Sequence, residues 1–140
     1  MLDTDTAYVA GLFDGEGCIL ISTRLRCGRP IFWLDIVITN TDKPVLDWLL
    51  ITVGGRMSKK PYNKNGNRDI WRWKTSSRKA ASVLRALLPY LRIKHEQAVI
   101  AIEFQMLLSS KTPGAKSTPD EIATLGKYRQ KLLAIRKRVA

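Results

Sequence analysis

Apolar and polar residues alternate along two stretches near the N-terminus, and this period of two predicts β-strands. In residues 18–26, Ile19 and Ile21 fall on one face, and polar and basic side chains follow on the other. In residues 32–38, every second residue is a large apolar one. The glycine and proline of Cys27–Pro30 mark a turn between the two stretches. We therefore predict an antiparallel hairpin.

A second hairpin is predicted further along the chain. Residues 56–61 and 69–75 form the strands, and a polar loop with Asn65 and Gly66 joins them. In each predicted strand the apolar set can face a core, which leaves the polar and basic set on an open face.

Cap residues, glycine stops and longer apolar periods predict helices around these hairpins. The predicted helices run from a cap at Thr4 or Thr6 to Phe13, from a cap at Asp42 to Val53, from a cap at Ser76 or Ser77 to Leu91, from Lys94 to Leu108, and onward from Thr118. The order α-β-β-α-β-β-α-α-α predicts an α+β fold with one antiparallel sheet covered on one face. A length of 140 residues suits a single domain, with a core over about 5–110 and a helical extension over about 111–140.

The charge of the chain is strongly positive and unevenly distributed. There are 24 Lys and Arg residues against 12 Asp and Glu, a formal net charge of +12. Residues 1–16 nevertheless hold four acids and no base, so the remaining 124 residues carry +16. Such a field attracts polyanions, of which nucleic acid is the commonest for a domain of this kind. The acidic start has two interpretations, a metal site facing phosphates or a solvated N-terminus.

Basic residues concentrate in the two predicted hairpins. Charged hairpin tips can serve only solubility and the protection of sheet edges. Two basic hairpins on one predicted sheet face, together with the net charge, favour a nucleic-acid surface instead, because a two-stranded ribbon fits the major groove. The predicted DNA contacts are Ser22, Arg24, Arg26, Arg29, Trp33, Asp35, Arg56, Ser58, Lys60, Arg68, Arg72 and Lys74.

Several classes of protein are excluded by what the sequence lacks. Cys18 and Cys27 have neither metal-ligand spacing nor the number for a disulfide framework, so reduced thiols are expected. No signal-peptide pattern opens the chain, and no apolar run is long enough to span a membrane. We expect a soluble intracellular protein without a small-molecule cofactor.

The first predicted helix carries two patterns that a fold alone does not require. Ala7, Gly11 and Gly15 recur every four residues, a stripe that lets another backbone approach closely, either within the chain or from a partner. Asp14 and Glu16 follow at the helix end, and two carboxylates at this spacing could hold Mg²⁺. The alternative for this pair is a glycine-rich helix stop with incidental acids.

The segment Val9–Gly17, VAGLFDGEG, resembles the nine-residue LAGLIDADG signature, with conservative replacements at its first, fifth, seventh and eighth places. The predicted order of elements matches the α-β-β-α-β-β-α core of the LAGLIDADG homing endonucleases. Residues 91–98 also resemble the family stretch that contains its active-site lysine. The resemblance covers about residues 5–110 and implies a saddle-shaped DNA-binding sheet, followed here by C-terminal helices.

The resemblance implies roles for individual residues. Glu16 would be the direct metal ligand, with the carbonyl of Gly17 helping to bind the ion or its waters. Lys94 would stabilise phosphate charge or help to activate water, and Asn40 would lie near the hydrolytic water. Asp14 would support the helix pair. The implied metal is Mg²⁺, and Mn²⁺ or Ca²⁺ could occupy the same site.

The resemblance does not assign a catalytic role to two further residues, Lys43 and His95. The family often has a second basic residue a few positions after Asn40, but this register gives Pro44, with Lys43 adjacent. A role for Lys43 therefore stays open. His95, the single histidine, is interpreted as an ordinary residue at a helix start.

A single copy of the signature implies a homodimer. One site cuts one strand, so a double-strand break requires two copies of this chain and a roughly palindromic target. The small-residue stripe would then line the contact between the two first helices. The implied interface residues are Ala7, Gly11, Leu12, Asp14 and Gly15.

The resemblance thus predicts an intron-encoded, Mg²⁺-dependent, site-specific endonuclease acting on double-stranded DNA. The alternatives are a non-cleaving nucleic-acid binder of the same fold, acting as a splicing cofactor (maturase) or regulator, and a general RNA-binding module. Glu16, Asn40 and Lys94 favour cleavage, because a binder does not need them. The six basic residues within 127–140 could add backbone contacts at the flanks of the site or form a solvated helix face.

Overall fold

The computed structural model describes residues 1–60, 69–111 and 116–139. Its helices are α1 (Asp3–Glu16), α2 (Lys43–Val53), α3 (Ser77–Leu87), α4 (His95–Ser109) and α5 (Pro119–Val139), with a short 3₁₀ turn η1 (Leu88–Tyr90). Its strands are β1 (Gly17–Arg26), β2 (Arg29–Asn40), β3 (Arg56–Lys59) and β4 (Trp71–Ser76).

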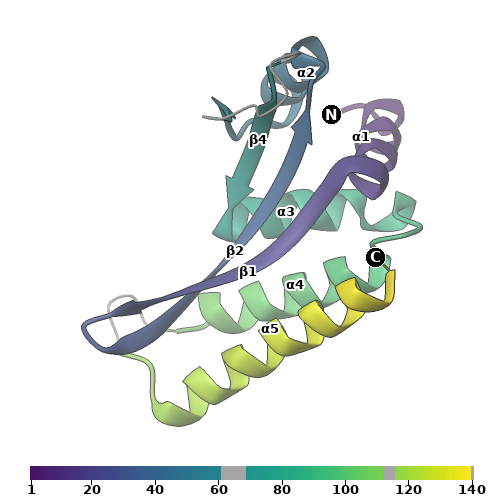
Figure 1. Cartoon of the computed structure of the whole chain (residues 1–140). Coiled ribbons are helices and arrows are strands. Elements are labelled where there is room, and N and C mark those ends of the chain that lie inside the picture. Colours follow the sequence, from purple (N-terminus) through teal and green to yellow (C-terminus); the bar gives the residue numbers. More distant parts are fainter. Residues whose placement is uncertain (61–68, 112–115, 140) are drawn as a thin grey trace.

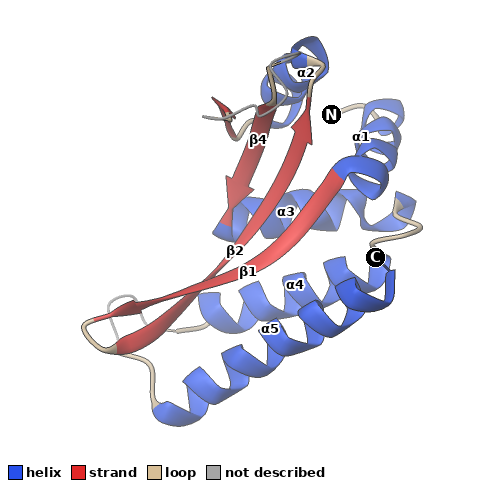
Figure 2. Ribbon diagram, in the orientation of Figure 1, coloured by secondary structure: helices blue, strands red, loops and turns tan. Residues whose placement is uncertain are grey.

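The described strands form one antiparallel sheet in the order β1-β2-β4-β3. Helices α3, α4 and α5 gather on one side of the strands (Figure 2), and α4 and α5 lie side by side (Figure 1). Helix α1 leads directly into β1, and α2 lies where β2 ends. The α+β class and the one-sided covering of the sheet are therefore confirmed.

Strand alternation separates a core face from an open face. Ile19 pairs with Ile36 and Ile21 with Leu34, and all four side chains are buried. They join one core cluster with residues from α1, α3, α4 and α5. The opposite side of the same strands defines the open face, which carries the intervening polar and basic residues.

The β1–β2 hairpin closes through a two-residue turn. Arg26 pairs with Arg29, and Cys27 and Gly28 between them both have positive φ, 51° and 78°. Positive φ at both central residues is the requirement of a type I′ turn, whose twist matches that of the flanking strands. The predicted turn and hairpin are confirmed. The Asn65-Gly66 loop of the second hairpin lies outside the described residues.

The start of α1 differs from the prediction. Thr6 lies inside the helix, where its Oγ1 donates to the carbonyl of Leu2 at 3.0 Å. Leu2 is the N-cap and makes no side-chain cap bond, so Thr4 and Thr6 are wrong as caps. Asp3 and Asp5 lie in the first turn, where the helix dipole favours negative charge, and this local attraction supports the earlier start.

Helix α2 follows its prediction closely. The Asp42 side chain accepts from the backbone N–H of Val45 at 3.0 Å, and Pro44 occupies the first turn. At the other end, Gly54 and Gly55 have φ of 90° and 100°. The indole of Trp73 donates to the Gly54 carbonyl at 2.6 Å, which binds the end of the helix to β4.

The third helix is shorter than predicted. It ends at Leu87 rather than Leu91, and the chain continues as η1. Pro89 has no backbone N–H to donate to the preceding turn, so the α-helical bonding stops there.

The C-terminal helix begins as predicted and packs against the core. The backbone N–H of Glu121 donates to Thr118 Oγ1 at 3.2 Å, while Leu125 and Leu132 belong to the core cluster. Lys111 binds the Glu121 carboxylate at 2.6 Å, and this hydrogen bond holds the pKa of Glu121 below its ordinary value. Within the described residues no helix has the length and apolar composition of a membrane span.

Candidate nucleic-acid interface and catalytic end

The open face of the sheet brings together basic residues from all four strands. The register pairs Arg56 with Lys74 and Ser58 with Arg72, on the side opposite to the buried Trp73. The same face continues into β1 and β2 through further cross-strand pairs. Its exposed members among the predicted DNA contacts are Arg24, Arg26, Arg29, Arg56, Ser58, Lys60 and Arg72.

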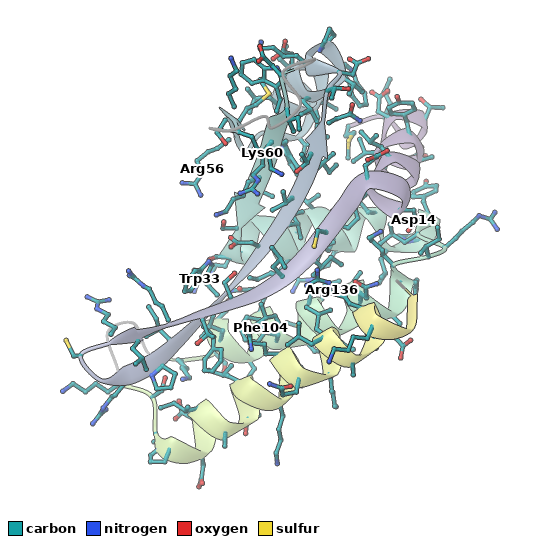
Figure 3. The ribbon with its side chains drawn as sticks, viewed as in Figure 1. Asp14, Trp33, Arg56, Lys60, Phe104 and Arg136 are labelled. Carbon is teal, nitrogen blue, oxygen red and sulfur yellow. The ribbon has the colours of Figure 1, made fainter. Side chains whose placement is uncertain are left out.

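The remaining predicted contacts differ in exposure. Ser22, Trp33 and Lys74 are half-buried, whereas Asp35 is only 4% exposed. Figure 3 shows Trp33 nearer to the β1–β2 turn than Arg56 and Lys60 are. Arg68 lies outside the described residues.

The C-terminal end of α1 exposes an acid without a partner. Glu16 is the last residue of the helix, and its carboxylate makes no hydrogen bond or ion pair with any described residue. A negative charge at this end of a helix is disfavoured by the dipole. Glu16 therefore makes no contact in the described chain that would stabilise the fold.

Asp14, two residues earlier, is fully engaged within the chain. Its carboxylate accepts from the backbone N–H groups of Arg92, Ile93 and Lys94 at 2.8, 3.2 and 3.0 Å. These donors immediately precede α4, so Asp14 binds the segment that leads into that helix to the end of α1. Sequence reasoning missed this contact. An acid in the last turn of a helix, against its dipole, is the signal that could have revealed it.

The Lys94 side chain also contacts the C-terminal end of α1. Its Nζ donates to the carbonyl of Asp14 at 2.7 Å, so the ammonium group lies at the carbonyl end of α1. Lys94 is the N-cap of α4, not a residue inside it. The structure thus places the predicted lysine against Asp14, which lies two residues before Glu16 in the chain. His95 is exposed in the first turn of α4.

Asn40 ends β2 next to the start of β1. Gly17 pairs with Ile38, and Asn40 lies two residues beyond that pair. Its Oδ1 accepts from the backbone N–H of Asp42 at 2.9 Å, which leaves the amide NH₂ without a partner among the described residues. Lys43, by contrast, binds Asp47 at 3.1 Å and lies 5.1 Å from the Trp71 ring centre.

Gly17 connects the helix end to the sheet at close quarters. Its N–H donates to the carbonyl of Phe13. A Cβ at this position would lie 2.3 Å from the Phe13 ring and 2.6 Å from its carbonyl oxygen. The turn that presents Glu16 therefore requires glycine at the next position.

The donors at this end suit a hard divalent cation. A free carboxylate and nearby backbone carbonyls are the oxygen ligands that Mg²⁺ and Ca²⁺ take in proteins. Within residues 1–60, 69–111 and 116–139, no three His, Cys, Asp or Glu residues gather as a metal cluster. One chain thus offers Glu16 as a single acidic ligand rather than a closed cage.

One exposed stripe of α1 consists of small, uncharged residues. Ala7, Gly11 and Gly15 are all exposed, and an added Cβ at either glycine would meet nothing within 4 Å. Leu12 is half-buried and packs at the margin of the core. We call the surface of Ala7, Gly11 and Gly15 the α1 face.

Comparisons with known proteins place the fold. Neither a family model nor a curated protein sequence matches this chain. Solved structures do match over most of its length. An archaeal intron-encoded homing endonuclease, I-Vdi141I, complexed with DNA, aligns with a TM-score of 0.80 and 18% identity over 95% of this chain and 84% of that one.

Two further solved structures agree. The homing endonuclease I-CvuI in complex with its target and Ca aligns at a TM-score of 0.77 and 17% identity, over 95% of this chain and 82% of that one. The LAGLIDADG homing endonuclease I-SmaMI bound to cleaved DNA aligns at 0.74 and 13% identity, over 91% of this chain and 43% of that one. The chain therefore has the fold of the LAGLIDADG homing endonucleases, the family that its sequence resembles.

Proposed function

We propose that this chain is a homing-type, site-specific endonuclease that cuts double-stranded DNA as a homodimer with Mg²⁺. The observation that carries the proposal is Glu16, an exposed carboxylate without a partner among the described residues, at the end of a helix that disfavours it. Strand β1 of the basic open face follows directly from this end of α1, and similar folds have been solved with DNA.

The residues at the catalytic end would divide the work. Glu16 and the Gly17 carbonyl would hold the metal, which when bound neutralises phosphate charge and lowers the pKa of a coordinated water. The Lys94 ammonium, already directed to the end of α1, would stabilise charge that develops on the phosphate. The free NH₂ of Asn40 would orient the attacking water.

The open face would position the duplex. Its exposed arginines and lysines can neutralise phosphates and read guanine edges in the major groove. The use of a divalent metal is supported by I-CvuI, which has a similar fold and was crystallised with the I-CreI target in the presence of Mg and with its own target in the presence of Ca.

A homodimer would account for the α1 face. Glycine inside a helix costs about 1 kcal/mol relative to alanine. Close packing within the described chain does not explain Gly11 or Gly15, because a Cβ added at either position would meet no atom within 4 Å. A second α1 approaching closely would explain both, and would bring two copies of Glu16 toward the two strands of one target. Ala7 and Leu12 complete the proposed interface, while Asp14, whose carboxylate is bound to residues 92–94, would border it.

Selection from a randomised duplex library in Mg²⁺ tests the function directly. We expect recovery of a cleaved, roughly palindromic site. Glu16→Gln should lower the cleavage rate by about 10³-fold, because metal-assisted charge neutralisation contributes several kcal/mol. It should leave DNA affinity close to wild type.

The matched control is Glu103→Gln, which removes one exposed acid on α4. It should cut at the wild-type rate. Undiminished cutting by Glu16→Gln would remove Glu16 from the mechanism. Binding of a selected site without any cleavage would instead identify a non-cleaving binder of this fold.

A further inference from the structure

A buried carboxylate lies in the middle of the open face. Asp35 is only 4% exposed and is the one ionisable residue among the buried side chains of the described chain. It belongs to β2, between Leu20 of β1 and Ser76 of β4. A buried charge is costly unless donors surround it, so its partners show what it does.

Donors from three strands converge on Asp35. The Trp33 indole donates to Oδ2 at 2.8 Å, and the Ser22 hydroxyl donates to the same oxygen at 3.2 Å. The Ser76 hydroxyl donates to Oδ1 at 2.5 Å, and Lys74 Nζ lies 3.7 Å from Oδ2. We call these five residues the Asp35 network.

This arrangement withdraws Asp35 from direct contact with DNA. A carboxylate offers only acceptors, and both oxygens already receive hydrogen bonds from the protein. Ser76, the N-cap of α3, makes no side-chain cap bond there because its hydroxyl is used by Asp35. The network therefore connects the open face to the start of the helix layer.

The same arrangement determines what Trp33 can offer. An indole has a single donor, and in Trp33 that donor is bound to Asp35. The ring is half-buried and held in one orientation, among the basic residues of the open face. It thus presents apolar surface without a hydrogen-bonding group.

We propose that Asp35 is a positioning residue that fixes Trp33 as an apolar contact for the C5-methyl group of thymine. This inference rests on the proposed function. In the major groove thymine is the base that presents a methyl group, whereas purines present N7 acceptors that an apolar ring would leave unpaired. The Trp33 ring therefore favours thymine at one position of each half-site, while Arg and Lys neighbours contact phosphates and guanines.

Deoxyuridine tests the inference, because it differs from thymidine only by the missing methyl group. Each thymine of the selected half-site is replaced singly, and affinity is measured in Ca²⁺. We expect one position at which the replacement weakens wild-type binding about fourfold, the effect of one buried methyl group. In Trp33→Ala this factor should fall to about one.

Two conservative variants separate positioning from contact. Asp35→Asn and Trp33→Phe both break the indole bond to the Asp35 carboxylate, so each should reduce the deoxyuridine factor to about twofold, about half the wild-type effect in free energy. Because both remove the same interaction, the double variant should show no further loss. Trp33→Phe retains Asp35, so the test stands even where Asp35→Asn unfolds.

Arg72→Ala is the matched control, an exposed open-face residue outside the Asp35 network. It should weaken binding while leaving the deoxyuridine factor at the wild-type value.

A selected site at which no replacement matters, or a factor unchanged in Trp33→Ala, would overturn the inference and leave the endonuclease proposal intact. A cytosine preference lost in Asp35→Asn would show direct reading by the carboxylate. If selection recovers no site at all, the proposed function fails, and this inference with it.

Discussion

The open face of the sheet and the α1 face are both exposed surfaces of the described chain, yet they differ in chemistry. The open face carries many separate charges on long side chains, such as Arg24 and Arg72. The α1 face carries no charge and almost no side chain. Coulomb attraction acts over several ångströms and is shared among many groups, whereas close helix packing depends on shape at each contact. One substitution should therefore harm the second surface far more than the first.

A large side chain on the α1 face is the strongest test of this difference. Gly15→Leu should weaken dimerisation at least about 30-fold, since overpacking costs about 1–3 kcal/mol and a two-fold axis repeats it. Sedimentation equilibrium measures the change. Ala86→Leu, at an exposed position of α3, is the control and should dimerise as the wild type does. A Gly15→Leu protein that dimerises normally would place the interface elsewhere.

Alanine substitutions distinguish the glycines of the α1 face from the glycine that ends the helix. Gly17→Ala should lower the free energy of unfolding by about 2 kcal/mol, because its Cβ would collide with Phe13. Gly15→Ala should raise the same quantity by about 0.5–1 kcal/mol in the dilute monomer, since open space surrounds it. Urea unfolding at low protein concentration measures both. Equal signs for the two variants would contradict the distinction.

Removal of one charge from the open face should have the smallest effect. Arg72→Ala should weaken DNA binding about tenfold and reduce the slope of log affinity against log salt by about one, the signature of one lost phosphate contact. Arg85→Ala removes an exposed arginine from the helix layer and should change neither value. Titrations at several salt concentrations give both quantities, and a similar loss for Arg85→Ala would disprove the one-sided surface.

The prediction of the fold succeeded where local chemistry is decisive. Asp42 and Pro44 at one end of α2 and Gly54 at the other define that helix through bonds to near neighbours. Period-two alternation likewise identified both faces of β1 and β2. The prediction failed at the start of α1, because Thr6 had two local options and its hydroxyl bonds back to Leu2 instead of capping.

In the candidate site, too, the sequence identified individual residues but not the contacts between distant segments. The sequence singled out Glu16 and Lys94, but not the contact between the end of α1 and the segment before α4. Asp14 makes this contact, and its partners are 78 or more residues away in the chain. Asp35 was grouped with the open-face residues by its position in the strand. Its burial depends on Ser22 and Ser76 from neighbouring strands, which alternation within one strand does not reveal.

By itself the sequence determined the elements, the two faces of the sheet, the excess of positive charge and the acid at the end of the first helix. These follow from short-range hydrogen bonding and from the spacing of side chains along one element. Only the tertiary structure decided that Asp14 is consumed by the fold, that Glu16 is left without a partner among the described residues, and that Asp35 holds Trp33. The reason is physical: a carboxylate has the same chemistry in all three places, and the donors that distant segments bring to it determine which one remains available.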